Sequence, residues 1–119
     1  MNKLVIKVTA GSDDAERANQ AFTVAATALA SGAEVSLWLT GEAAWFAVPG
    51  RAEEIALPHA TPLADLLAAV LAGGTVTLCT QCAARRELTA ADIVEGIRIA
   101  GAMTFVEEAL TDGTQGLVY

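Results

Sequence analysis

The sequence predicts one α/β domain over residues 1–119, with a five-stranded, mostly parallel, doubly wound sheet that carries helices on both faces. Strand-like apolar runs alternate with helix-like segments along the whole chain, which is typical of a parallel sheet. Gly32 and Gly73 stand where two of these helices should end. A length of 119 residues is that of a single domain.

The first half of the chain should supply two strands and a long helix. Residues 3–9 form a β-branched run that predicts the first strand, buried on both faces. Ser12 or Asp13 is placed to cap the next helix, which should end at Gly32 because glycine favours the left-handed position after a helix. A strand over residues 34–40 and a short helix over residues 42–48 should follow.

The second half should supply the other three strands. Thr61 is placed to cap a helix that has Pro62 at its first position and ends at Gly73. The strands are expected over residues 75–79, 96–100 and 115–119, and the helices to about residue 86 and over residues 89–94 and 103–110. We expect the flavodoxin-like strand order 2-1-3-4-5, which would put residues 10–14 and the turn after the third strand at one crevice.

The only two cysteines, Cys79 and Cys82, form a Cys-x-x-Cys motif between the third strand and a helix. Backbone N–H groups and the dipole at a helix start favour the thiolate of Cys79. Cys82 can resolve a disulfide or persulfide on Cys79, or can pack against the sheet. Arg85 and Arg86 are placed to stabilise a thiolate, or form a solvated helix face.

Two further residues are supporting candidates only because of the predicted crevice. Ser12 and Asp13 would lie there, although such residues more often cap helices. His59 and the two thiols are too few ligands for a zinc site, so no metal is expected. No glycine-rich phosphate loop occurs, and we expect no nucleotide or flavin cofactor.

Composition limits the partners. A net charge of -7 without a basic stripe argues against nucleic acid, and no apolar run is long enough for a membrane span. The sequence shows no export signal, which predicts a cytoplasmic protein with reduced thiols. Because 54% of the residues are hydrophobic and 18% are charged, we expect a homo-oligomer rather than an alanine-rich monomer.

The chain resembles the DsrE/DsrF family of small α/β proteins associated with sulfur transfer. The resemblance is carried by Gly-Ser-Asp-Asp at residues 11–14, by the step from Gly32 into the second strand, and by the third strand running into Cys79, Cys82 and an arginine pair. It implies that Cys79 carries sulfur as a persulfide between donor and acceptor proteins, and that the chain forms trimers or hexamers.

Three functions therefore stay open. The first is a sulfur carrier of the sulfurtransferase type, with Cys79 as the acceptor. The second is a dithiol–disulfide redox protein that cycles Cys79 and Cys82. The third is an oligomeric scaffold or regulatory module without enzymatic activity, in which the cysteines are incidental.

Overall fold

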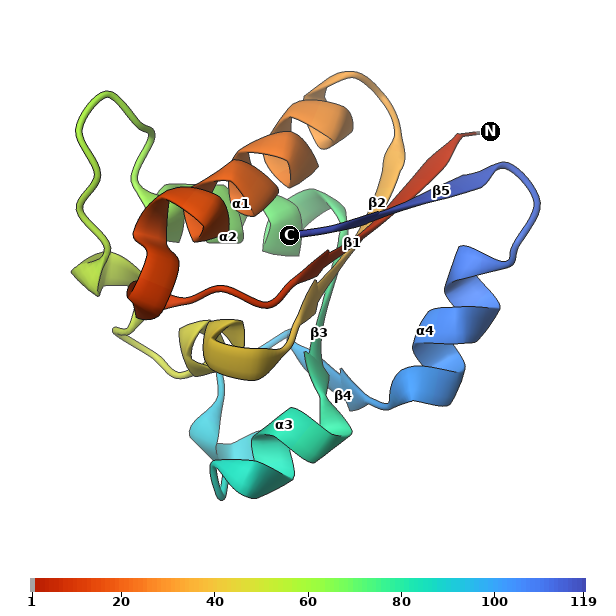
Figure 1. The fold of residues 1–119 in the computed structure, drawn as a ribbon. Helices are drawn as coiled ribbons and strands as arrows, with labels where there is room; N and C mark the ends of the chain where they lie inside the picture. The colour runs from red at the N-terminus through yellow and green to blue at the C-terminus, as the bar shows by residue number, and fades with distance from the viewer. Residues whose placement is uncertain (1) are drawn as a thin grey trace.

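The computed structural model describes residues 2–119 and has five parallel strands in one sheet, with helices on both faces, as the sequence predicts (Figure 1). The strands are β1 (Lys3–Val8), β2 (Glu34–Leu39), β3 (Thr75–Cys79), β4 (Arg98–Ala100) and β5 (Thr114–Val118). The α-helices are α1 (Ala15–Ala30), α2 (Leu63–Gly73), α3 (Thr80–Arg85) and α4 (Ala102–Ala109). The 3-10 helices are η1 (Ser12–Asp14), η2 (Gly41–Ala47), η3 (Ala52–Glu54) and η4 (Ala90–Asp92). No helix within residues 2–119 is both long enough and apolar enough to cross a membrane.

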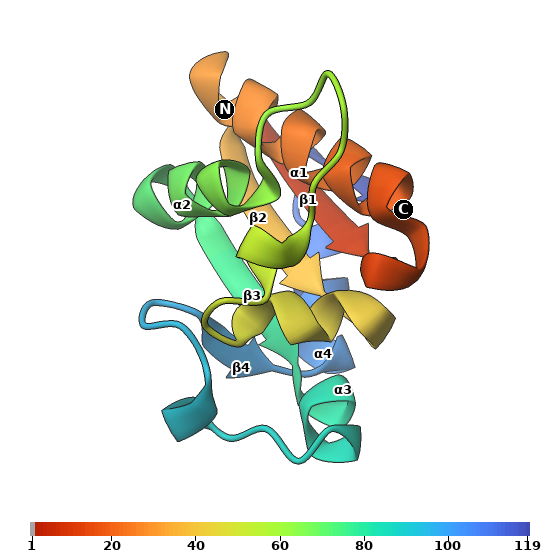
Figure 2. The ribbon, with the colours of Figure 1, turned by 90° about the vertical axis from the view of Figure 1, so that its left-hand side faces the viewer.

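The strand order is β4-β3-β2-β1-β5, so the predicted order 2-1-3-4-5 is wrong. Strands β1 to β4 lie side by side in chain order, and only β5 returns to the far edge of β1. Right-handed crossovers then place α1 and α2 on one face and α4 on the other (Figures 1 and 2). Strand β2 takes the centre because its side chains from residue 35 onward are all buried. It separates residues 10–14 from the cysteine turn, and the predicted shared crevice does not form.

The two faces of the sheet differ in chemistry. The face under α1 and α2 is apolar and forms the main core with Phe22, Leu63 and Val70. Its strand residues are Ile6, Val8, Val35, Leu37, Leu39, Val76 and Leu78. The face under α4 carries Lys3 and Lys7 on β1 instead. On this face Val5 is fully buried and both lysines are half-buried, so the prediction that β1 is buried on both faces holds only in part for the α4 face.

Helix starts also differ in detail from the prediction. Ser12 and Asp13 lie in η1 and do not cap α1; Asp14 does, because its carboxylate accepts the Arg17 N–H at 3.2 Å. Pro62 rather than Thr61 is the cap residue of α2. The short helices predicted over residues 42–48 and 89–94 form as η2 and η4.

Candidate active site around Cys79

Cys79 is the last residue of β3 and the residue from which α3 starts. Its side chain is half-buried, whereas that of Cys82 is buried. Burial raises the pKa of the Cys79 thiol. This effect is outweighed by hydrogen bonds from the backbone N–H groups of Cys82 and Gln81, by a hydrogen bond with the Cys82 side chain, and by the charge of Lys7. The pKa of Cys79 therefore lies below its ordinary value, which increases the thiolate fraction at neutral pH.

Cys82 is fixed to the end of β2. Its Sγ accepts the backbone N–H of Gly41 at 3.2 Å. Gly41 has a φ of 52°, and a Cβ there would lie 2.9 Å from the carbonyl oxygen of Thr9, so glycine suits this position. With Cys82 held in this way, Cys79 is the more accessible of the two sulfur atoms.

Both cysteines line a small cavity of about 210 Å³ at the carboxyl end of the α4 face. Its other walls come from three elements that are remote in sequence, namely β1, the end of β2 and α4. The side chains that matter for the chemistry are Lys7, Trp38, Thr40, Cys79, Cys82 and Phe105.

One cation and two aromatic rings line the cavity together with the thiols. Lys7, Trp38 and Thr77 occupy one row across β1, β2 and β3, and Cys79 lies two residues beyond Thr77. The Lys7 ammonium lies 4.7 Å from the centroid of the Phe105 ring, a cation–π contact. The Phe105 ring meets the Trp38 ring edge-to-face at 5.4 Å between centroids.

Helix α4, which forms one wall of the cavity, is tied to the sheet through Glu108. This carboxylate accepts hydrogen bonds from the Ser36 hydroxyl at 2.6 Å and the Trp38 indole N–H at 3.2 Å, and it pairs with Arg98. Burial raises the pKa of Glu108, but these hydrogen bonds and the Arg98 charge outweigh it and hold the pKa below its ordinary value. Glu108 therefore stays ionised at neutral pH and keeps α4 on the sheet.

The structure brings only some of the predicted supporting residues to the cysteines. Arg86 donates to the Cys82 carbonyl oxygen at 3.2 Å, but its charge is paired with Glu42 at 2.9 Å. Arg85 is exposed on α3. Ser12 and Asp13 do not line the cavity.

Sequence reasoning missed Lys7, Trp38, Phe105 and Glu108. A signal for Lys7 was present in the alternation of β1, where Lys3 and Lys7 share one face and Ile6 and Val8 the other. Such spacing marks a polar face of a strand.

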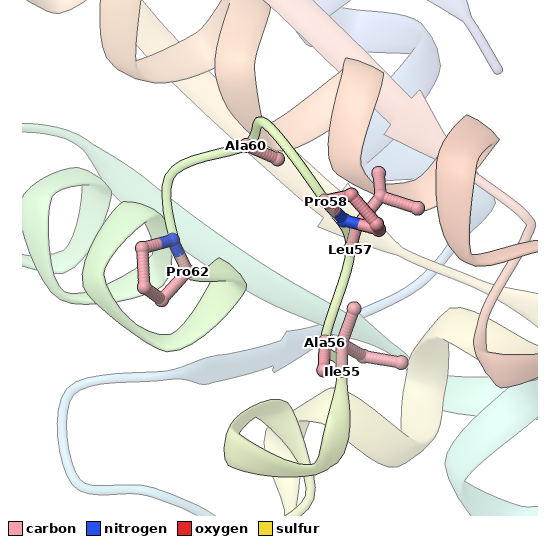
Figure 3. Close-up of a pocket in the computed structure, with 6 residues that line it drawn as sticks. All are labelled: Ile55, Ala56, Leu57, Pro58, Ala60 and Pro62. Carbon is pink, nitrogen blue, oxygen red and sulfur yellow. The ribbon is translucent and has the colours of Figure 1, made fainter.

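A larger hollow lies elsewhere, along the loop between η3 and α2 (Figure 3). It measures about 470 Å³ and is lined by Ile55, Ala56, Leu57, Pro58, Ala60 and Pro62. None of these side chains is nucleophilic or titratable, so no reaction is expected in the hollow.

His59 lines a neighbouring groove against α1 and not the cysteine cavity. No three His, Cys, Asp or Glu side chains within residues 2–119 are grouped to hold a metal ion.

Comparison with known proteins identifies relatives of both sequence and fold. A model of the DsrE/DsrF-like family matches residues 2–117. The uncharacterized protein MJ0760 of Methanocaldococcus jannaschii is 30% identical over 107 residues, which cover 89% of this chain and 39% of that protein. The ychN protein of E. coli has a similar structure, with a TM-score of 0.81 at 18% identity over all of both chains. MTH1491 of Methanobacterium thermoautotrophicum, described as of unknown function, gives a TM-score of 0.76 at 10% identity over all of both chains.

Proposed function

This chain belongs to the DsrE/DsrF-like family, and from that premise and the geometry at Cys79 we propose that it is a sulfur carrier that holds sulfur as a persulfide on Cys79. The main support for this proposal is the position of the Cys79 thiol. It is half-buried, its pKa is lowered, and it lies in a cavity that is also lined by the cation of Lys7. A thiolate is the nucleophile that sulfane sulfur requires.

The chemistry balances without an external oxidant. The Cys79 thiolate attacks the outer sulfur of a donor persulfide, and an S–S bond forms at Sγ. The donor's own S–S bond breaks, and its electron pair leaves on the donor cysteine as a thiolate. Any proton on the outer sulfur travels with it. The reverse sequence delivers the sulfur to an acceptor thiol.

Exposure to glutathione persulfide should add the mass of one sulfur atom to the protein, measured by intact mass spectrometry. The Cys79→Ser variant should lose this addition, because its oxygen cannot form a persulfide. The Cys82→Ser variant should keep it, because Cys82 is buried and its sulfur is engaged by Gly41. Alkylation after loading with peptide mapping checks which sulfur is modified.

Loading that persists in Cys79→Ser and disappears in Cys82→Ser would reverse the assignment. If neither the native chain nor any variant is loaded, the sulfur-carrier function is wrong, and the scaffold is favoured only where no disulfide forms either. Cys82→Ser also serves as the matched control, since both variants replace one sulfur by oxygen within the same turn.

A dithiol–disulfide cycle is the second candidate, and one contact favours it. The Cys82 side chain hydrogen-bonds to Cys79, so the two sulfur atoms lie close to each other. The same mass measurement separates the two functions, because oxidation to a disulfide removes two hydrogen atoms instead of adding sulfur. A stable disulfide with no persulfide would favour the redox cycle.

We also propose that the chain works as a homo-oligomer, a trimer or hexamer as the family resemblance implies. Met103 and Val106 on α4 and Leu110 directly after it are exposed residues, with exposed fractions of 78%, 49% and 78%. These residues follow the three-to-four spacing of one helix face. An exposed apolar face of this kind is typical of a protein–protein contact.

Light scattering should therefore return a mass of several protomers. Leu110→Asp should lower that mass, because a carboxylate would be buried in the contact. Thr27→Asp, on the exposed side of α1, is the matched control and should leave the mass unchanged. A concentration-independent mass near 12.2 kDa for the native chain would contradict the proposal.

A further inference from the structure

Lys7 lacks the carboxylate partner that the other lysine has. Five of the seven basic side chains form ion pairs within residues 2–119, and Lys7 and Arg85 form none. Arg85 is exposed, but Lys7 is half-buried under α4. Partly buried charges in proteins are normally paired, so a lone cation in a chain of net charge -7 needs an explanation.

The position of Lys7 beside the thiol explains why it has no carboxylate partner. Its ammonium contacts the Phe105 ring, and the cavity that it lines is also lined by Cys79. Lys7 is the only basic side chain among the residues that line this cavity. An anionic group on the thiol would therefore supply the partner that Lys7 lacks.

A persulfide would move the negative charge away from the backbone N–H groups at Sγ, within the cavity that Lys7 also lines. On the free thiolate the charge sits on Sγ, where the N–H groups of Gln81 and Cys82 act on it. On a persulfide it sits on the outer sulfur, about 2.05 Å further from the backbone. Lys7 then becomes the main source of positive charge for the loaded form.

We propose that Lys7 is a positioning residue that stabilises the outer sulfur of a Cys79 persulfide as an anion, and that it thereby sets how strongly the carrier retains sulfur. This inference rests on the proposed carrier function. The cavity suits small anionic sulfur groups, since it measures about 210 Å³ and is lined by one cation, whose ammonium lies over the Phe105 ring. Phe105 holds the ammonium through its ring face.

The test measures the loading equilibrium of the full chain in mixtures of glutathione persulfide and glutathione, with the loaded fraction read by intact mass. Lys7→Gln should lower the ratio of loaded to free Cys79 about ten-fold, which corresponds to one pKa unit of charge stabilisation. Lys7→Arg should restore most of the loading. Lys3→Gln is the matched control and should load like the native chain, because Lys3 is on the same strand and face but pairs with Glu34 at 3.5 Å.

Alkylation of the unloaded protein supplies a second measurement. Removing the cation should shift the alkylation profile of Cys79 to higher pH, but by less than the loss in loading, since backbone N–H groups remain at Sγ. Lys7→Met retains the apolar stem against Phe105 and replaces Lys7→Gln if that variant does not fold. If Lys7→Gln and Lys3→Gln load equally, Lys7 does not stabilise the persulfide. If Lys7→Gln and Lys7→Arg lose loading equally, the positive charge is not the cause. Either result would overturn this inference and leave the carrier function standing. Absence of persulfide on the native chain would overturn the carrier function and the inference together.

Discussion

Replacing Gly11 by alanine should lower the free energy of unfolding by about 3 kcal/mol, the upper part of the range for overpacking. A Cβ at this position would lie 2.5 Å from the carbonyl oxygen of Glu42, and that oxygen belongs to the backbone of η2. Because the contact is with backbone atoms of Glu42 rather than with the end of a flexible side chain, it cannot be relieved by a rotation. The loops after β1 and β2 would therefore have to separate.

Separation of the two loops should also weaken the contact between Gly41 and Cys82. Glu42 follows Gly41, whose N–H engages Cys82 Sγ, and it pairs with Arg86. We expect faster alkylation of Cys82 in Gly11→Ala than in the native chain, alongside the loss of stability in urea.

Gly116→Ala is the matched control for this experiment. A Cβ at Gly116 would meet nothing within 4 Å, and alanine in a strand is favoured over glycine by about 0.5 kcal/mol. This variant should be neutral or slightly stabilised. Equal unfolding midpoints for Gly11→Ala and Gly116→Ala would show that the two loops are not held in close contact.

Local sequence patterns were sufficient to predict the elements and their direction. The β-branched runs, the stop at Gly32 and the Pro62 start gave five strands and the helices between them, because each depends on neighbours within one turn or one strand. The position of Cys79 at the end of β3 follows from the same local reasoning.

The strand order could not be obtained in this way. It depends on which strand best tolerates burial on both faces, and β2 does so only because α4 covers Trp38 and Ser36 from the other side. Lys7 and Phe105 were missed for the same reason. They are 98 residues apart in sequence, and only the return of the chain to the far edge of β1 brings them together.

Replacing Trp38 by alanine should cost about 3–5 kcal/mol of unfolding free energy, as expected for truncation of a fully buried tryptophan. Only 1% of the Trp38 side chain is exposed, and its ring packs against Phe105. The change also removes the indole N–H that Glu108 accepts, and so weakens the attachment of α4. Chemical denaturation followed by circular dichroism measures this loss.

The other tryptophan shows whether burial is the cause. Trp45 is half-exposed in η2, and its ring contacts the guanidinium groups of Arg51 at 4.7 Å and Arg86 at 5.8 Å. Trp45→Ala should cost about 1–2 kcal/mol, because exposed cation–π contacts are weak. Trp38→Ala, but not Trp45→Ala, should also change persulfide loading, since Trp38 separates Lys7 from β3 and lines the cavity. Similar costs for the two variants would mean that the burial of Trp38 under α4 contributes little to stability.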